Sequence, residues 1–92
     1  MPVVVRLPTV LRSFAGGAEQ VEVADAGTVG AVFAALEQQY PALHHRITDD
    51  QGGLRRHVNV YLGDDNVRDL DDLATPVSHG DELLVLPAVS GG

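Results

Sequence analysis

The order of strand-like and helix-like segments is the feature that most constrains how this chain can fold. Two segments rich in valine or alternating in polarity come before a single helical pattern, and further strand-like segments come after it. The predicted strands are 3–7, 19–23, 57–62, a short edge segment near Val67 and 82–86. A mixed sheet with one helix across one face accommodates this order, because each layer buries its apolar side against the other. We therefore predict an α+β fold of two layers.

The predicted helix follows Thr28, whose side chain can cap the first turn. Val29, Val32, Phe33 and Leu36 then recur at helical spacing, and the helix should end before Pro41. The segment 82–86 is apolar at every position after its first, which suits a central strand. Four to five strands with one main helix across one face form the β-grasp pattern.

The chain of 92 residues has room for one domain, which we place at residues 1–86, followed by a flexible C-terminal tail at 87–92. No apolar run approaches the roughly 18–20 residues of a membrane span. Met1-Pro2 leads directly into three valines, without the pattern of a secretory signal. We therefore expect a cytoplasmic protein that does not contact the membrane.

Composition narrows the possible chemistry. The chain has no cysteine, which excludes a disulfide framework, a thiolate zinc site and a cysteine nucleophile. Its formal charge is −7, and all six of its basic residues are arginines. Such a balance repels nucleic acid and anionic lipid, so we expect a protein partner with a basic face.

The tail ends in two glycines, and its members are Pro87, Ala88, Val89, Ser90, Gly91 and Gly92. Glycine has no Cβ, so a Gly-Gly end can enter a slot too narrow for any other residue. A frayed chain end without a role would look similar. Because this end closely follows the last strand of a predicted β-grasp domain, we interpret it as a segment that binds inside another enzyme.

Two segments carry a resemblance to a known family. Through 86–92 and Gly80-Asp81-Glu82, the chain resembles the MoaD/ThiS group of ubiquitin-like sulfur carriers along its whole length. Three further segments, 8–12, 57–62 and 73–75, are similar to the branch that serves a cysteine-synthase pathway. Ala88 and the long stretch before His57 depart from small subunits of molybdopterin synthase, which remain an alternative.

This resemblance implies that Gly92 carries the reactive group. An E1-like enzyme would use ATP to adenylate the terminal carboxylate, and sulfur would displace AMP to give a thiocarboxylate. A mixed anhydride with AMP has a good leaving group, whereas a carboxylate is a poor electrophile. The chain would then be a protein cosubstrate and not an enzyme, with no bound cofactor of its own.

The resemblance also implies the partners. The first is the E1-like adenylating and sulfurtransferase enzyme. In the cysteine branch, a PLP-dependent cysteine synthase that uses O-phosphoserine accepts the sulfur, and a JAMM-type zinc peptidase releases the product. In some pathways of this kind a synthase of thiolated metabolites draws on the same carrier.

Recognition should use the face of the sheet that the helix leaves uncovered. If Val58 and Val60 face the helix, Tyr61 points outward, and we place Leu83 and Val85 of the last strand beside it. Arg6 and Arg12 are candidate rim contacts. The plain alternative is an apolar sheet surface without a role.

Other signals and functions carry less weight. The four histidines lack metal-ligand spacing, and the acidic turns lack the ligand pattern of a calcium loop. Two alternative functions remain open. One is a ubiquitin-like modifier that forms isopeptide bonds with lysines of target proteins, and the other is a non-covalent binding module.

Overall fold

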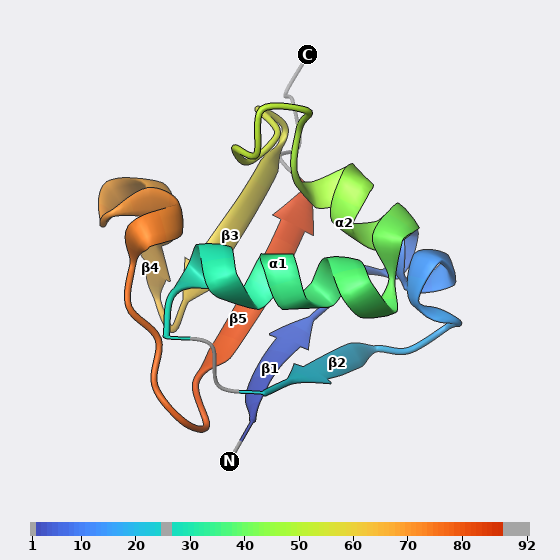
Figure 1. The fold of residues 1–92 in the computed structure, drawn as a ribbon, viewed down its shortest axis with the longest axis horizontal. Coiled ribbons are helices and arrows are strands. Elements are labelled where there is room, and N and C mark those ends of the chain that lie inside the picture. Colours follow the sequence, from blue (N-terminus) through green and yellow to red (C-terminus); the bar gives the residue numbers. More distant parts are fainter. Residues whose placement is uncertain (1, 25–26, 88–92) are drawn as a thin grey trace.

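A mixed β-sheet forms one layer of the protein (Figure 1). The computed structural model describes residues 2–24 and 27–87, and all statements about structure refer to these residues. The strands are β1 (Val3–Arg6), β2 (Gln20–Val23), β3 (Val58–Leu62), β4 (Asp65–Asn66) and β5 (Glu82–Pro87), and their order in the sheet is β2-β1-β5-β3-β4. β1 and β5 pair in parallel, while the other neighbours are antiparallel. The predicted mixed sheet and the central position of the last strand are confirmed.

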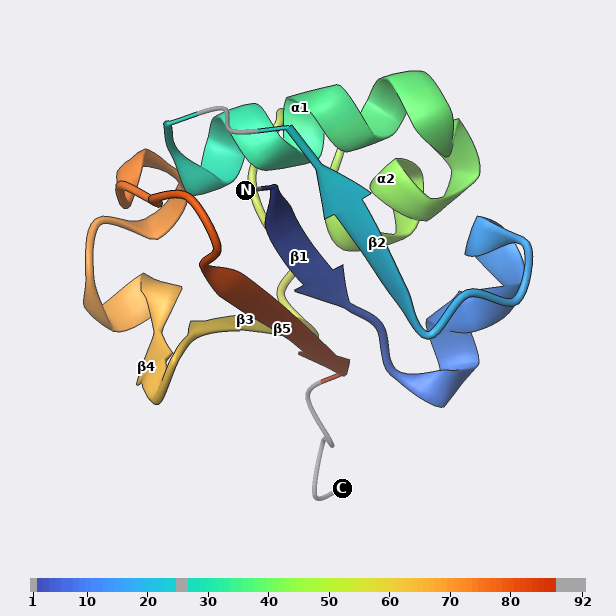
Figure 2. The ribbon, with the colours of Figure 1, turned by 90° about the horizontal axis from the view of Figure 1, so that it is seen from below.

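The main helix, α1 (Val29–Gln39), crosses one face of the sheet (Figures 1 and 2). The side-chain oxygen of Thr28 accepts a hydrogen bond from the backbone N–H of Ala31 at 3.1 Å, so the predicted cap is present. The buried residues of α1 are the four that the helical spacing selected: Val29, Val32, Phe33 and Leu36. Burial of this apolar stripe against the sheet fixes the orientation of the helix.

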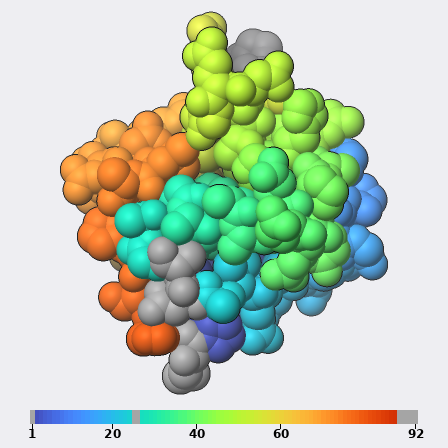
Figure 3. Space-filling model, viewed as in Figure 1, coloured from blue at the N-terminus to red at the C-terminus, as the bar shows by residue number. Residues whose placement is uncertain are grey.

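A second helix, α2 (Pro41–Ile47), was not predicted. Proline ends a helix that precedes it, but its fixed φ also suits the first position of a new helix. Here Tyr40 has φ −139° and separates the two helices, and Pro41 begins α2. Leu43 and Ile47, one turn apart, are both buried. Residues of α1 and α2 form the central band of this side of the molecule (Figure 3).

Two further segments differ from the sequence-based expectation. Residues Thr9–Ala15, which lie between the first two predicted strands, form a 3-10 helix that was not predicted, and it ends at Gly16, whose φ is +66°. The short edge strand lies at Asp65–Asn66, just before the expected position at Val67. In the described part of the chain, no helix is long and apolar enough to cross a membrane.

Candidate functional site

The described chain ends at the carboxyl end of the central strand. Pro87, which we predicted to be the first residue of the tail, is the last residue of β5 and lies opposite Val58 of β3. β1 pairs with β5 only as far as Leu84, so Pro87 lies beyond the part of β5 that has a neighbouring strand on both sides. The predicted site residues Ala88, Val89, Ser90, Gly91 and Gly92 lie outside the described residues. Pro87 is therefore the part of the predicted tail that the structure places.

A groove of about 230 Å³ lies beside Pro87. Its apolar lining comes largely from the 3-10 helix, which contributes Val10, Leu11 and Phe14. Val10 is 64% exposed, so its side chain is accessible to a partner at this groove. This 3-10 helix was not predicted, although the spacing of Val10, Leu11 and Phe14 is helical and could have indicated it.

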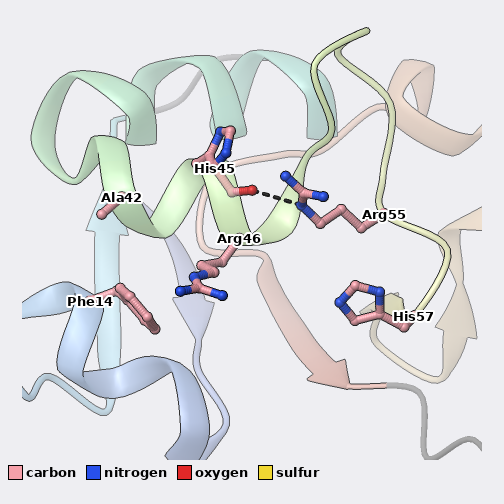
Figure 4. Close-up of a pocket in the computed structure, with 6 residues that line it drawn as sticks. All are labelled: Phe14, Ala42, His45, Arg46, Arg55 and His57. Carbon is pink, nitrogen blue, oxygen red and sulfur yellow. Dashed lines mark hydrogen bonds between the residues drawn. The ribbon is translucent and has the colours of Figure 1, made fainter.

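A larger pocket of about 530 Å³ adjoins the groove (Figure 4). Its lining residues are Phe14, Ala42, His45, Arg46, Arg55 and His57. The groove and the pocket share Phe14, Arg46 and His57. The carboxyl end of β5 is thus bordered by an apolar groove that continues into a pocket lined with basic side chains.

The outer face of the sheet, opposite α1 and α2, is the second candidate surface (Figure 2). Val60 is fully buried on the helix side, so Tyr61 lies on the outer face, where it is opposite Leu84. Leu86 follows on the same face of β5 and is 37% exposed. The structure thus places Tyr61 on the predicted face, and its contact with a partner stays a prediction.

The placement of Leu83 and Val85 on that outer face was wrong. Both side chains have 0% exposure and lie in the core, where Leu83 is opposite Val5 and Val85 is opposite Val60. Since β5 is apolar on both faces, its sequence does not show which set points inward. The partners in β1 and β3 decide it, because their buried residues determine the inner face.

The two candidate rim arginines are paired with acidic side chains. Arg6 lies 3.2 Å from Glu82 on the outer face of the sheet, and both side chains are about half exposed. Arg12 lies 3.9 Å from Glu19 and donates a hydrogen bond to the backbone carbonyl of Leu7. Exposed pairs of this kind contribute little stability, roughly 0–1 kcal/mol.

The described residues contain no group of three or more His, Cys, Asp or Glu side chains that could hold a metal ion. His44 instead contacts side chains of neighbouring residues in α1 and at the end of α2. Its ring lies 3.5 Å from the carboxylate of Glu37 and within hydrogen-bond distance of the Thr48 hydroxyl. This histidine therefore links α1 to α2.

Comparison with known proteins gives matches along the whole chain. The ThiS family matches residues 5–92. The sulfur carrier protein CysO of Mycobacterium tuberculosis is 43% identical over 94 residues, which cover all of both proteins. A chain in the crystal structure of the Amycolatopsis orientalis BexX/CysO complex is 37% identical with a TM-score of 0.88, and the match covers 98% of this chain and 99% of that one.

A relative with a different name also matches. Small archaeal modifier protein 3 of Haloferax volcanii is 41% identical over 68 residues, which are 74% of this chain and 73% of that protein. The family match extends to the terminal glycines, and the structural match extends over nearly the whole fold. Together they confirm the resemblance that the sequence suggested: the chain belongs to the ThiS family of ubiquitin-like β-grasp proteins.

Proposed function

We propose that this chain is a sulfur carrier whose Gly92 carboxylate is adenylated by an E1-like enzyme and converted to a thiocarboxylate. The observation that carries the proposal is the match to CysO over all of both chains, in a fold whose central strand leads to the Gly-Gly end. The chain acts as a protein cosubstrate, and its partner enzymes supply the catalytic groups.

The proposed chemistry has two steps. A Gly92 carboxylate oxygen attacks the α-phosphorus of ATP, and pyrophosphate leaves. A sulfur nucleophile then attacks the acyl carbon of the adenylate, and AMP leaves with the C–O bonding electrons. Because this chain has no cysteine, the sulfur comes from another molecule.

The fold supports this chemistry by fixing the origin of the tail. β5 pairs with β1 on one side and with β3 on the other, so Pro87 is held by a strand that cannot move independently of the sheet. Five residues follow Pro87, and a fully extended segment of that length spans at most about 18 Å. An enzyme site up to that distance from the sheet is within reach of the Gly92 carboxylate.

The similarity to CysO supports cysteine biosynthesis as the destination of the sulfur. In this proposal the thiocarboxylate attacks an aminoacrylate that a PLP-dependent synthase makes from O-phosphoserine. The acyl group then moves from sulfur to nitrogen, and a JAMM-type zinc peptidase cleaves the resulting amide to release cysteine. The similarity to a chain that was crystallised with BexX supports a further partner enzyme, such as a synthase of thiolated metabolites.

Intact mass spectrometry tests the proposal. The chain is incubated with ATP, a sulfide source and the E1-like enzyme of its own host. We expect the mass to rise by the difference between sulfur and oxygen, and we expect no change in a variant that lacks Gly92. An unchanged mass of the full chain with active enzyme would refute the proposal.

A protein modifier is the second candidate, because the chain is 41% identical to small archaeal modifier protein 3. The same adenylate would then be attacked by a lysine amine of a target protein to form an isopeptide bond. The chain itself has no lysine, so it offers no side-chain amine for linking its own copies. Immunoblots of the native host separate the two functions, since a modifier gives a ladder of conjugates and a carrier gives one band.

A further inference from the structure

The arginines of this acidic protein are not all paired with carboxylates. Arg6 and Arg12 lie close to Glu82 and Glu19, as described above. Arg68 donates from its terminal nitrogens to backbone carbonyls of residues 55, 56 and 58. The other three arginines have no carboxylate within 4.0 Å among the described residues: Arg46, Arg55 and Arg56. With 13 acidic residues in the chain, these unpaired cations form a local exception to its negative charge.

Arg46 and Arg55 both line the pocket that adjoins the groove (Figure 4). The guanidinium carbon of Arg46 lies 4.7 Å from the centre of the Phe14 ring, a cation–π contact. The Nε of Arg55 donates to the backbone carbonyl of His45 at 2.8 Å. Neither arginine uses its two terminal nitrogens in a hydrogen bond with the described residues. Both groups are therefore held in place while most of their donors remain available.

The backbone beside the pocket is held as well. The carbonyls of Arg55 and Val58 both accept hydrogen bonds from the side chain of Arg68, at 2.5 and 2.8 Å. This side chain ties the segment before β3 to the 3-10 helix Val67–Asp69. A site with fixed donors loses less conformational entropy on binding, which favours recognition of a complementary group.

The pocket is continuous with the origin of the tail. Phe14, Arg46 and His57 line both the pocket and the groove that contains Pro87. An enzyme that accepts the Gly-Gly end must surround the chain beyond Pro87, so part of its surface lies against this groove. The basic pocket adjoins this groove, so an enzyme that lies against the groove can also contact the pocket.

We propose that the pocket binds an acidic segment of the enzyme that accepts the tail, an inference that rests on the proposed sulfur-carrier function. A carboxylate of that segment accepts hydrogen bonds from Arg46 and Arg55. An apolar side chain next to it packs on Val10 and Leu11 in the groove. Because the rest of the carrier is acidic, this contact also sets the orientation in which the two proteins meet.

Binding to the activating enzyme tests the proposal by isothermal titration calorimetry. The double variant R46Q/R55Q removes the charges of both pocket arginines. The control is R56Q, which changes the adjacent exposed arginine. We expect the dissociation constant of R46Q/R55Q to rise about tenfold or more, and that of R56Q to change less than about twofold. Added salt should weaken binding of the wild type more than that of the double variant. Equal affinities for all three proteins would overturn the proposal.

Loss of the Arg55 bond to His45 could disturb the fold, so R46Q alone serves as a second variant. The Arg46 side chain makes no hydrogen bond with the described residues, and because it is exposed it can be shortened without leaving a buried polar group. We expect R46Q to keep the circular dichroism spectrum of the wild type and to weaken binding severalfold. Unchanged binding by R46Q and by a folded double variant would contradict the proposal.

A peptide titration separates failure of this inference from failure of the proposed function. If no activating enzyme adds sulfur to the chain, the proposed function fails and the peptide then decides the inference. The probe is an acetylated Glu-Leu-Glu-Glu amide added to the ¹⁵N-labelled full chain, with the Gln-Leu-Gln-Gln analogue as control. We expect shifts of the Arg46, Arg55 and His57 signals with the acidic peptide only. Equal responses to both peptides, or none to either, would overturn the inference.

Discussion

Replacing Leu83 by alanine should destabilise the fold far more than the same change at its neighbour, Leu84. Leu83 has 0% exposure in the core, whereas Leu84 is half-buried on the outer face of the sheet. Truncation of a fully buried leucine costs about 2–5 kcal/mol, because it loses apolar contacts and leaves a cavity. A domain of this size has a free energy of unfolding of roughly 5–14 kcal/mol. L83A should therefore lose a large share of it, and L84A about 1 kcal/mol or less.

Urea denaturation gives the free energy of unfolding of both variants, and thermal denaturation gives their melting temperatures, each followed by far-ultraviolet circular dichroism. For a loss of about 3 kcal/mol in L83A, the melting temperature should fall by roughly 12–24 °C. L84A should melt within a few degrees of the wild type. If L84A lost as much stability as L83A, the assignment of the inner and outer faces of β5 would be wrong.

Two smaller perturbations test local features of the fold. T28A removes the cap bond to the Ala31 N–H and should lower the free energy of unfolding by about 1 kcal/mol, whereas T9A, at an exposed position, should change it little. Equal effects in urea denaturation would contradict the capping role. R68K cannot reproduce the fork of hydrogen bonds to the backbone carbonyls of Arg55, Arg56 and Val58, and it should lower the free energy of unfolding by roughly 1–3 kcal/mol. Amide hydrogen exchange should be faster in residues 55–58 of R68K, and unchanged exchange would refute this role.

The main helix and the central position of the last strand could be predicted from their polarity patterns. The helical spacing from Val29 to Leu36 selects a single buried face, and Thr28 marks where the helix begins. β5 shows where this reasoning stops. Its apolar residues on both faces predicted a central strand correctly, but they gave no information on which face is buried.

Helix α2 and the basic pocket were not predicted from the sequence, and the reasons differ. Pro41 was interpreted only as the end of a helix, although the same residue can begin one. Arg46 and Arg55 are nine positions apart, and Phe14 comes from a distant segment. Only the packing of α2 against the 3-10 helix Thr9–Ala15 and the loop before β3 brings them together. No spacing rule within the sequence indicates such a pocket.

Tandem mass spectrometry of the carrier after reaction with ATP, sulfide and the activating enzyme tests the central claim most directly. Fragmentation of the C-terminal peptide assigns any added sulfur to a single residue. Sulfur on the Gly92 carbonyl is the result that the proposed chemistry requires. Sulfur on any other residue, with an unmodified Gly92, would contradict it.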